Sequence, residues 1–590
     1  MFSNLVQRRG QSARRCGLPS WCFVVGSIVF GIHSLSAEED DWPRFRGTNG
    51  GGASRSELPV SWTPSRNVAW RTPLPGPGVS SPIVVRDRLF VTCYSGYGMK
   101  KGELGDIELL KRHLLCLDTV TGAMIWERTV AAIQPEDSFS GIGIPAHGYA
   151  SHTPTSDGKH VYAFFGKSGV VAYDLNGNPL WQTSVGTESD PWKWGSSSSP
   201  ILYEDLVIVT ASAESQAIIG LDKHSGKQVW RQEAVGLDGM WGTPALAKVD
   251  DQRTDLVLSV PKEIWGLDPT NGNLRWYCQA TKAEQVHSSP LTGGGLVFAF
   301  TGRGGGSVAV RAGGIGDVSP SHVIWSGPDS ARFGSPVGYR SNLYLVGNGI
   351  LTTINGRTGK RVSQLRLTGG RASSGGSGTA DFASPVIAGG KLYYTLSTGD
   401  TYVFELEGDL KQLSVNVLTM DSERFGGSPA ISRNRMFVRS DKAIYCITQM
   451  ESDVPSNASL ALFTDTSLKP AGESVDLADN GSSPGNEASA SFGAVAFDPV
   501  SIFNSRDRNQ DGFLDRSELR GDLLDILTTR DKNDDQLLSL QEFRDYSRDV
   551  FAANFPESPS SSSNVNSTRT TRADQRPARP QRPMPSDDSH

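Results

Sequence analysis

Cysteine is scarce in this chain, and its scarcity excludes a disulfide-stapled scaffold. Only six cysteines occur among 590 residues, and no two of them are adjacent. Four lie beyond the leading segment, namely Cys93, Cys116, Cys278 and Cys446. Small disulfide-stabilised domains use far more cysteine per residue. Cys93 and Cys116 fall on strands that we expect to be neighbours, so one disulfide and buried free thiols both remain open.

An excess of basic residues is also missing. The formal net charge is −6, and the first 37 residues carry four arginines and no acidic residue, so the remainder has a net charge of −10. Binding to a phosphate backbone requires a basic face. The composition therefore argues against a nucleic-acid partner.

The N-terminal region lacks an apolar run long enough for a typical membrane span. Its apolar stretch, Trp21 to Ile32, is about a dozen residues, whereas a spanning helix needs about 20. Arginines precede this stretch and small residues at Ser36-Ala37 follow it, as in a secretory signal. We predict a signal peptide over residues 1–37 and export to the periplasm, the cell surface or the medium. An uncleaved N-terminal anchor is the alternative.

The middle of the chain repeats itself. A Ser/Thr-Pro pair recurs in steps of 72, 46, 44, 46, 46, 49 and 44 residues. The pairs are Ser81-Pro82, Thr153-Pro154, Ser199-Pro200, Thr243-Pro244, Ser289-Pro290, Ser335-Pro336, Ser384-Pro385 and Ser428-Pro429. Eight starts indicate eight units. The long first step contains an insertion, placed at Gly96 to Arg112 or at Ala131 to Ala146.

Within each unit, strand-like apolar stretches such as Leu206 to Thr210 and Leu392 to Leu396 follow turns. Four units carry a turn of the type Asp-x-x-x-Gly or one residue shorter, followed by tryptophan. These turns start at Asp118, Asp174, Asp222 and Asp268, and lead to Trp126, Trp181, Trp230 and Trp276. In such a hairpin Asp caps the turn, Gly takes the positive φ, and we expect Trp to lie flat between adjacent sheets.

Four-stranded units of this length are β-propeller blades. Apolar residues at helical spacing, which helical repeats of similar length would show, are lacking. The eighth unit ends near Thr448 without a tryptophan turn, and Val68 to Thr72 precedes the first unit. We therefore predict an all-β, eight-bladed propeller over residues 38–450, in which Val68 to Thr72 supplies the missing outer strand and closes the ring.

The turn motif resembles the tryptophan-docking motif of the quinoprotein alcohol dehydrogenase-like (PQQ-like repeat) propellers. Asp41 to Gly47 (DWPRFRG) is similar to an N-terminal motif of secreted PQQ-like propellers from planctomycete-type bacteria. The resemblance covers about Trp42 to Gln449. Units five to eight depart from it, because Trp325 lacks the preceding Asp and Gly and the turn Asn355 to Gly359 has no following Trp. Those blades must close their outer turns in another way.

The resemblance includes both PQQ-dependent dehydrogenases and a non-enzymatic lipoprotein of outer-membrane barrel assembly. The dehydrogenases hold their quinone under a disulfide between adjacent cysteines, beside calcium and a catalytic Asp. This chain has no adjacent cysteines, and no acidic residue stands out as a catalytic base. PQQ is therefore not supported as a cofactor, no catalytic residue is assigned, and the cofactor-binding residues are unknown. A hydrolytic site in the first-unit insertion, around His113 or His147, is a further alternative.

A ligand of the propeller would bind at the channel mouth, just before the Ser/Thr-Pro starts. The residues there are Tyr149, His152, Trp194, Trp241, His287, Arg332, Phe333, Asp381, Phe382, Arg424 and Phe425. Aromatic and charged side chains around a funnel suit a protein, peptide or glycan partner. The alternative is that they pack between neighbouring blades and plug the channel. His152 and His287 by themselves do not indicate a metal.

The C-terminal part carries two loops with the calcium-binding pattern of an EF-hand. In the first, Asp507, Asn509, Asp511, Phe513 (by its carbonyl), Asp515 and Glu518 provide oxygen ligands, and Gly512 permits the sharp turn. The second has Asp531, Asn533, Asp535, Leu537 (by its carbonyl), Ser539 and Glu542. Gln536 replaces the glycine there, so the second site is expected to be weaker. Leu514 and Leu538 are expected on the short strands that pair the loops.

The flanks complete the domain organisation. Apolar residues at helical spacing, such as Leu523, Leu527 and Tyr546, predict an α-helical EF-hand pair over residues 495–555. Polar, weakly periodic composition predicts a flexible linker over 451–494 and a disordered tail over 556–590. The predicted function is an exported calcium-binding propeller that acts as a non-catalytic binding or scaffold protein; the alternative is a PQQ-dependent oxidoreductase.

Calcium titration of the full-length protein by calorimetry tests the loops. We expect two binding events, the second weaker. Glu518→Gln removes one oxygen ligand of a bidentate pair and should abolish the tighter event. An isotherm unchanged by this substitution would refute the assignment.

Overall fold

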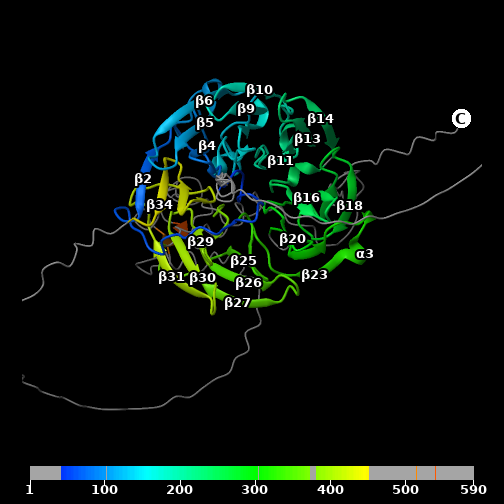
Figure 1. The fold of residues 1–590 in the computed structure, drawn as a ribbon. Helices are drawn as coiled ribbons and strands as arrows, with labels where there is room; N and C mark the ends of the chain where they lie inside the picture. Colours follow the sequence, from blue (N-terminus) through cyan, green and yellow to red (C-terminus); the bar gives the residue numbers. More distant parts are fainter. Residues whose placement is uncertain are drawn as a thin grey trace, which may run out of the picture. The chain divides into compact units, whose positions relative to one another are not determined.

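The computed structural model describes residues 41–100, 102–234, 236–302, 305–371 and 381–450, together with 513–514 and 538–539. Residues 41–450 form eight β-sheets arranged in a ring, coloured from blue to yellow in Figure 1. The predicted eight-bladed propeller is confirmed. Among the described residues, no helix is long and apolar enough to cross a membrane.

The first four blades follow one another along the chain. Blade 1 contains β3 (Ile83–Val85), β4 (Arg88–Ser95), β5 (Lys111–Asp118) and β6 (Met124–Ala131). Blade 2 contains β7 (Thr155–Ser156), β8 (His160–Phe164), β9 (Val170–Asp174) and β10 (Pro179–Thr183). Blade 3 contains β11 (Ile201–Tyr203), β12 (Leu206–Ala211), β13 (Ala217–Asp222) and β14 (Gln228–Glu233). Blade 4 contains β15 (Ala245–Lys248), β16 (Thr254–Val260), β17 (Glu263–Leu267), β18 (Leu274–Gln279) and β22 (Gly316–Asp317).

The remaining four blades bring the chain back to its start. Blade 5 contains β19 (Leu291–Gly293), β20 (Leu296–Phe300), β21 (Ser307–Arg311) and β23 (Val323–Gly327). Blade 6 contains β24 (Val337–Tyr339), β25 (Asn342–Gly347), β26 (Ile350–Asn355) and β27 (Arg361–Arg366). Blade 7 contains β28 (Val386–Ala388), β29 (Lys391–Thr395), β30 (Thr401–Glu405), β31 (Lys411–Asn416) and β1 (Ala53–Ser54). Blade 8 contains β32 (Ala430–Ser432), β33 (Arg435–Arg439), β34 (Ala443–Thr448) and β2 (Val68–Pro73).

The ring closes in the predicted way. β2 pairs antiparallel with β34 and becomes the outer strand of blade 8. Three α-helical turns, α1 (Ile144–His147), α2 (Ser212–Ser215) and α3 (Ser319–His322), and three 3-10 turns, η1 (Ile107–Leu109), η2 (Gly166–Ser168) and η3 (Leu237–Gly239), lie in connections. The first-unit insertion occupies both candidate positions. The β4–β5 connection and the segment after β6 pack together around Tyr97, Ile144 and Tyr149.

A belt of hydrogen bonds explains the Ser/Thr-Pro repeat. The backbone N–H of each Ser or Thr donates to the side-chain hydroxyl of the same residue in the next blade. Seven such bonds, of 2.8 to 3.0 Å, run from Ser81 through Thr153, Ser199, Thr243, Ser289, Ser335 and Ser384 to Ser428. The following proline has no N–H to leave unpaired at the inner edge of the blade. We call this set the hydroxyl belt.

The tryptophans join neighbouring blades at the outer rim. The indole of Trp181, for example, donates to the carbonyl of Lys223 in the turn of the next blade. A Cβ on Gly226 of that turn would lie 2.6 Å from the Trp181 ring, so only glycine fits there. The same docking joins Trp70 to Thr119, Trp126 to Leu175, Trp230 to Pro269 and Trp325 to Gly356. The apolar clusters likewise lie between adjacent blades.

This arrangement corrects one interpretation of the sequence. Trp325 seemed to lack its turn, yet it docks normally, because each tryptophan contacts the turn of the following blade and Asn355 to Gly359 provides it. Blade 5 lacks this turn, so Trp276 of blade 4 instead donates to Asp255. The longer β21–β23 connection adds β22 alongside β18. The sequence predicts that some blades close their outer turns in another way, and this prediction is confirmed for blade 5.

All four described cysteines are buried free thiols. Cys93 lies opposite His113 in the β4–β5 pairing, whereas Cys116 lies opposite Phe90. Side chains alternate between the faces of a strand, so Cys93 and Cys116 point to opposite faces of blade 1. The disulfide that the sequence left open is therefore not formed.

The C-terminal unit is described by itself and only at four residues. β35 (Phe513–Leu514) pairs antiparallel with β36 (Leu538–Ser539), with Leu514 opposite Leu538. The predicted pairing of the two loops through these leucines is confirmed. The predicted EF-hand helices, linker, signal peptide and tail fall outside the described residues.

Tryptophan docking can be tested with two glycine substitutions. Gly226→Ala should lower the free energy of unfolding by about 3 kcal/mol, because positive φ strain adds to a clash with Trp181. Gly408→Ala is the control: Gly408 also has positive φ, at +76°, but nothing lies within 4 Å of its added Cβ, so about 1 kcal/mol is expected. Equal losses in denaturant unfolding would show that docking at Gly226 contributes nothing.

Candidate functional site

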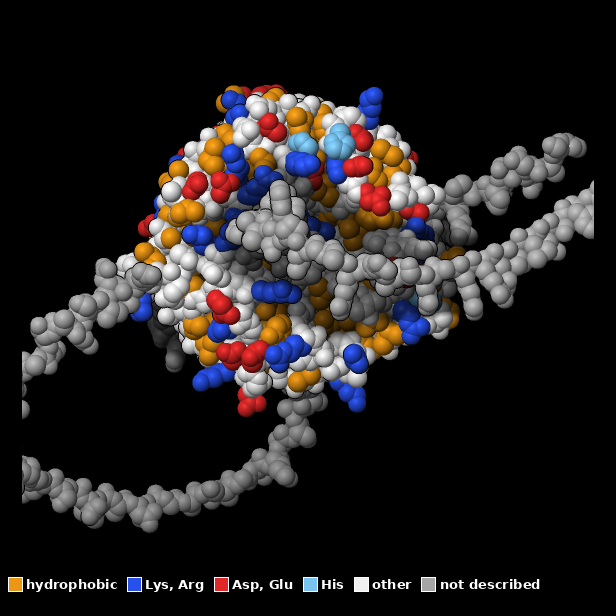
Figure 2. All heavy atoms as spheres, in the orientation of Figure 1, with side chains coloured by type: hydrophobic (Ala, Val, Ile, Leu, Met, Phe, Trp, Pro, Cys, Tyr) orange, Lys and Arg blue, Asp and Glu red, His pale blue; other side chains and the backbone are white. Residues whose placement is uncertain are grey.

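The residues predicted at the channel mouth differ in exposure. Tyr149, His152, Trp241 and Phe425 are buried, and Arg332 is exposed. The others, half-buried, are Trp194, His287, Phe333, Asp381, Phe382 and Arg424. Burial of the first group agrees with packing between blades, whereas the half-buried group contacts both the protein and solvent. On the face shown in Figure 2, basic and acidic side chains are interspersed around the described rim.

Five of these rings and one neighbouring ring form a continuous row, which we call the aromatic arc. Its members are Trp192, Trp194, Trp241, His287, Phe333 and Phe382, and successive ring centroids are 4.8 to 5.9 Å apart. Trp241 and His287 stack with an interplanar angle of 8°. Trp192 ends the arc with 43% of its surface exposed. Sequence reasoning missed Trp192, because it lies two residues further from the repeat start than Trp194.

A buried polar cluster adjoins the arc between blades 2 and 3. The hydroxyl of Ser196 donates to Glu214 Oε1 over 2.5 Å and lies 3.0 Å from His152 Nε2. The other oxygen of Glu214, Oε2, is buried without a partner. Burial raises the pKa of Glu214 from 4.5 to about 7 and lowers the pKa of His152 from 6.5 to about 3. The cluster can therefore hold a proton on Glu214 near neutral pH while His152 stays neutral.

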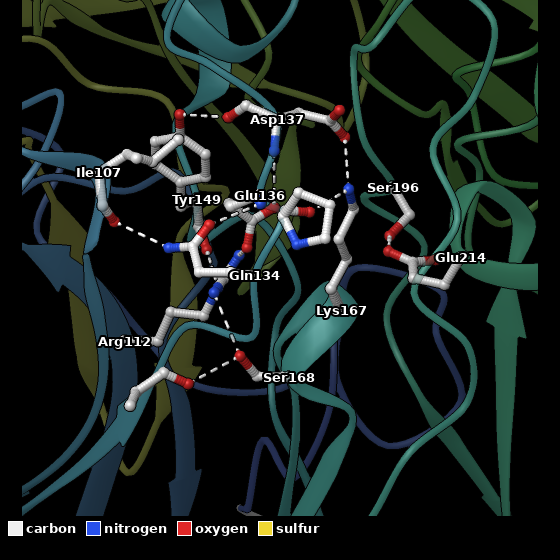
Figure 3. Close-up of polar contacts among 12 residues, drawn as sticks. Ile107, Arg112, Gln134, Glu136, Asp137, Tyr149, Lys167, Ser168, Ser196 and Glu214 are labelled. Atoms are coloured by element: carbon white, nitrogen blue, oxygen red, sulfur yellow. Dashed lines mark hydrogen bonds and ion pairs between the residues drawn. The ribbon is translucent and has the colours of Figure 1, made fainter. Parts of the chain in front are cut away.

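Charged side chains beside this cluster neutralise one another, as Figure 3 shows. Arg112 from β5 bonds to Glu136 over 2.5 Å, and both side chains are buried. Lys167 from η2 lies 3.4 Å from Asp137 and also bonds to Ser189. The ion pairs join the segment after β6 to blades 1 and 2. They hold the first-unit insertion against the mouth.

These groups line a pocket of about 30 Å³ that includes His147, Tyr149, Ser196 and Glu214. A cavity of this size accommodates one water molecule, whereas small-molecule sites measure about 300–1,000 Å³. A tricyclic quinone such as PQQ does not fit this pocket. The 4.8 Å stack of Trp241 on His287 likewise leaves no gap for a further ring between them.

The insertion histidines have polar partners. His113 Nδ1 lies 2.6 Å from Glu127 Oε1, and its Nε2 lies 2.7 Å from the Ser95 hydroxyl. This Ser–His–Glu order resembles that of hydrolytic triads, but none of the three residues lines the pocket above. His147 bonds to Ser151 and to the carbonyl of Trp194, and its pKa is lowered by burial. It positions the Trp194 loop.

The predicted calcium ligands fall almost entirely outside the described residues. Only Phe513 and Ser539 are described, and they lie opposite each other in the β35–β36 pair. The others are Asp507, Asn509, Asp511, Asp515, Glu518, Asp531, Asn533, Asp535, Leu537 and Glu542. Within the described part of the chain, no group of three His, Cys, Asp or Glu residues could hold a metal ion.

Fold and repeat together define a β-propeller of PQQ-like repeats. A family model described as outer membrane protein assembly factor BamB matches residues 108–234 and 214–454, more than half of the chain. The chain belongs to this family. No curated protein matches it.

Several solved structures are similar in fold. A europium-containing methanol dehydrogenase shares 12% identity over 68% of this chain and 89% of its own, with a TM-score of 0.46. BamB from Moraxella catarrhalis shares 13% over 67% and 98%, with a TM-score of 0.41. The quinohemoprotein alcohol dehydrogenase ADHIIG from Pseudomonas putida HK5 shares 10% over 74% and 83%, with a TM-score of 0.47.

The pH dependence of stability tests the state of Glu214. Because its pKa is raised in the folded protein, the stability it contributes is complete below pH 4.5 and is lost as pH rises through 7. Glu214→Gln removes this titration. Between pH 4.5 and 7, the unfolding free energy of the wild type should therefore fall by roughly 3 kcal/mol relative to that of the variant. His152 titrates in both proteins, so its effect cancels. Parallel curves would contradict the raised pKa.

Proposed function

We propose that this protein is an exported, calcium-binding propeller that acts as a non-catalytic binding module and holds a protein partner at its channel mouth. The observation that supports the proposal is the aromatic arc, which crosses blades 3 to 7 and ends in the exposed Trp192. Tryptophan and other aromatic side chains carry much of the energy of protein interfaces. The arc presents such side chains from a rigid scaffold.

The composition of the mouth favours a protein over a small ligand. Arg332 stacks on Phe333 at 4.8 Å, and the half-buried Asp381 and Arg424 add charges of both signs. Aromatic residues and arginine are enriched at protein interfaces. The family description names an assembly factor, which also favours a protein partner over a glycan.

A non-catalytic role agrees with the pocket beside the arc. Its volume of about 30 Å³ suits one water molecule, and its arginine and lysine are paired with Glu136 and Asp137. The site therefore offers neither room nor unpaired cations for a carboxylate-bearing quinone. Calcium would bind at the two C-terminal loops and stabilise that module, since the twelve ligand residues supply the hard oxygen donors it prefers.

Site-specific photo-crosslinking in the producing cells tests the partner. With p-benzoylphenylalanine in place of Trp192, we expect one protein adduct. The control position is Val229 in β14, the outermost strand of blade 3, which is 56% exposed, and it should give none. Phe382→Ala at the other end of the arc should weaken the adduct, because the partner contacts the whole arc. Equal adducts at 192 and 229, or none at 192, would contradict the proposal.

Reconstitution tests the enzymatic alternative. Purified protein supplied with PQQ and calcium should not reduce an artificial electron-accepting dye when alcohols are added. Dye reduction that depends on added PQQ would overturn the non-catalytic assignment and favour a quinoprotein oxidoreductase.

A further inference from the structure

The segment Asp41 to Ser54 passes through the centre of the propeller. It contacts the inner strand, or the proline just before it, in five blades. Trp42 forms a β-bridge with Val84, and the carbonyl of Pro43 accepts a hydrogen bond from the backbone N–H of Ser156. Arg44 donates to the carbonyl of Pro244 and Arg46 to that of Pro336. Strand β1 pairs with β28. These contacts belong to blades 1, 2, 4, 6 and 7. Only a segment inside the channel can reach all of them, so we call residues 41–54 the channel segment.

Two arginines of the channel segment are buried. Arg44 is 9% exposed and Arg46 is 1% exposed. Their hydrogen-bond partners are backbone carbonyls: Arg44 Nη2 donates to Pro244 over 3.5 Å, and Arg46 Nη2 donates to Gly51 over 3.4 Å and to Pro336. No ion pair among the described residues involves either guanidinium. Within the described part of the chain, neither of these two buried cations is paired with a carboxylate.

Both side chains stay charged at neutral pH. Burial lowers the pKa of Arg44 to about 10, and burial together with the nearby Arg44 charge lowers that of Arg46 to about 9. A buried charge needs a counter-charge with hydrogen bonds.

The buried side-chain polar atoms of the channel segment that lack a hydrogen-bond partner are all nitrogen atoms. They are Trp42 Nε1, Arg44 Nε, Arg46 Nε and Arg46 Nη1, all of them buried. Every one of these side-chain atoms is a hydrogen-bond donor. Donors with net positive charge and low exposure are what an anion requires.

We propose that the channel binds a small inorganic anion, a halide or an oxyanion, against Arg44 and Arg46. The anion accepts hydrogen bonds from the free Nε and Nη1 groups and neutralises part of the charge. It thereby fastens the DWPRFRG motif inside the ring. This site is separate from the mouth and does not depend on a protein partner there.

Anomalous scattering tests the site directly. Crystals of the full-length protein are grown with sodium bromide and, separately, with sodium selenate. We expect an anomalous peak within hydrogen-bond distance of Arg46 Nε, Arg46 Nη1 or Arg44 Nε in at least one of them. The proposal would be overturned if, in both crystals, these nitrogen atoms contacted only water or a carboxylate of the chain itself.

Thermal unfolding gives a second measurement. At constant ionic strength, replacing a bulky organic anion by chloride or phosphate should raise the Tm of the wild type by several degrees, because ligands of the folded state stabilise it. The double variant Arg44→Met, Arg46→Met should lose this dependence. Arg66→Met, which removes an exposed guanidinium outside the channel segment, should keep it. An unchanged dependence in the double variant would count against the site, and if that variant does not fold, the crystals decide.

Discussion

The hydroxyl belt is the interaction on which the ring depends. Blades 2 to 8 each begin with a Ser or Thr whose hydroxyl accepts a backbone N–H from the preceding blade, and these seven bonds follow one another around the channel. Because all its residues are buried, each bond replaces a desolvated N–H that would otherwise be unpaired. The belt sets the spacing of the inner strands, and the proline after each hydroxyl removes a donor that this inner edge could not satisfy.

At the outer rim, tryptophan side chains join neighbouring blades. Like the bonds of the hydroxyl belt, they extend from one blade to the following one. Five tryptophans, Trp70, Trp126, Trp181, Trp230 and Trp325, extend to the turn of the next blade, where glycine leaves room for the indole ring. Loss of the turn in blade 5 is compensated locally: Trp276 bonds to Asp255, and β22 extends the sheet of blade 4. Inner hydroxyls and outer indoles together allow individual blades to vary without opening the ring.

In the centre of the closed ring, burial shifts the pKa values of ionisable groups. At the mouth, burial raises the pKa of Glu214 and lowers that of His152, while Arg112 and Lys167 are neutralised by Glu136 and Asp137. In the channel, the partners of Arg44 and Arg46 among the described residues are backbone carbonyls. The charges at the mouth are paired with charges of opposite sign, whereas, within the part of the chain that the structure describes, those in the channel are not. For this reason we assign the anion to the channel.

The sequence by itself determined the number of blades, the closing strand Val68 to Pro73 and the pairing of Leu514 with Leu538, because repeat spacing and turn chemistry are properties of short segments. It could not show which turn receives Trp325, that Cys93 and Cys116 face apart, or that Trp192 ends the aromatic arc. The places of Arg44 and Arg46 were also decided by the tertiary structure. Their carbonyl partners lie 200 and 290 residues away along the chain, and only closure of the ring brings them together.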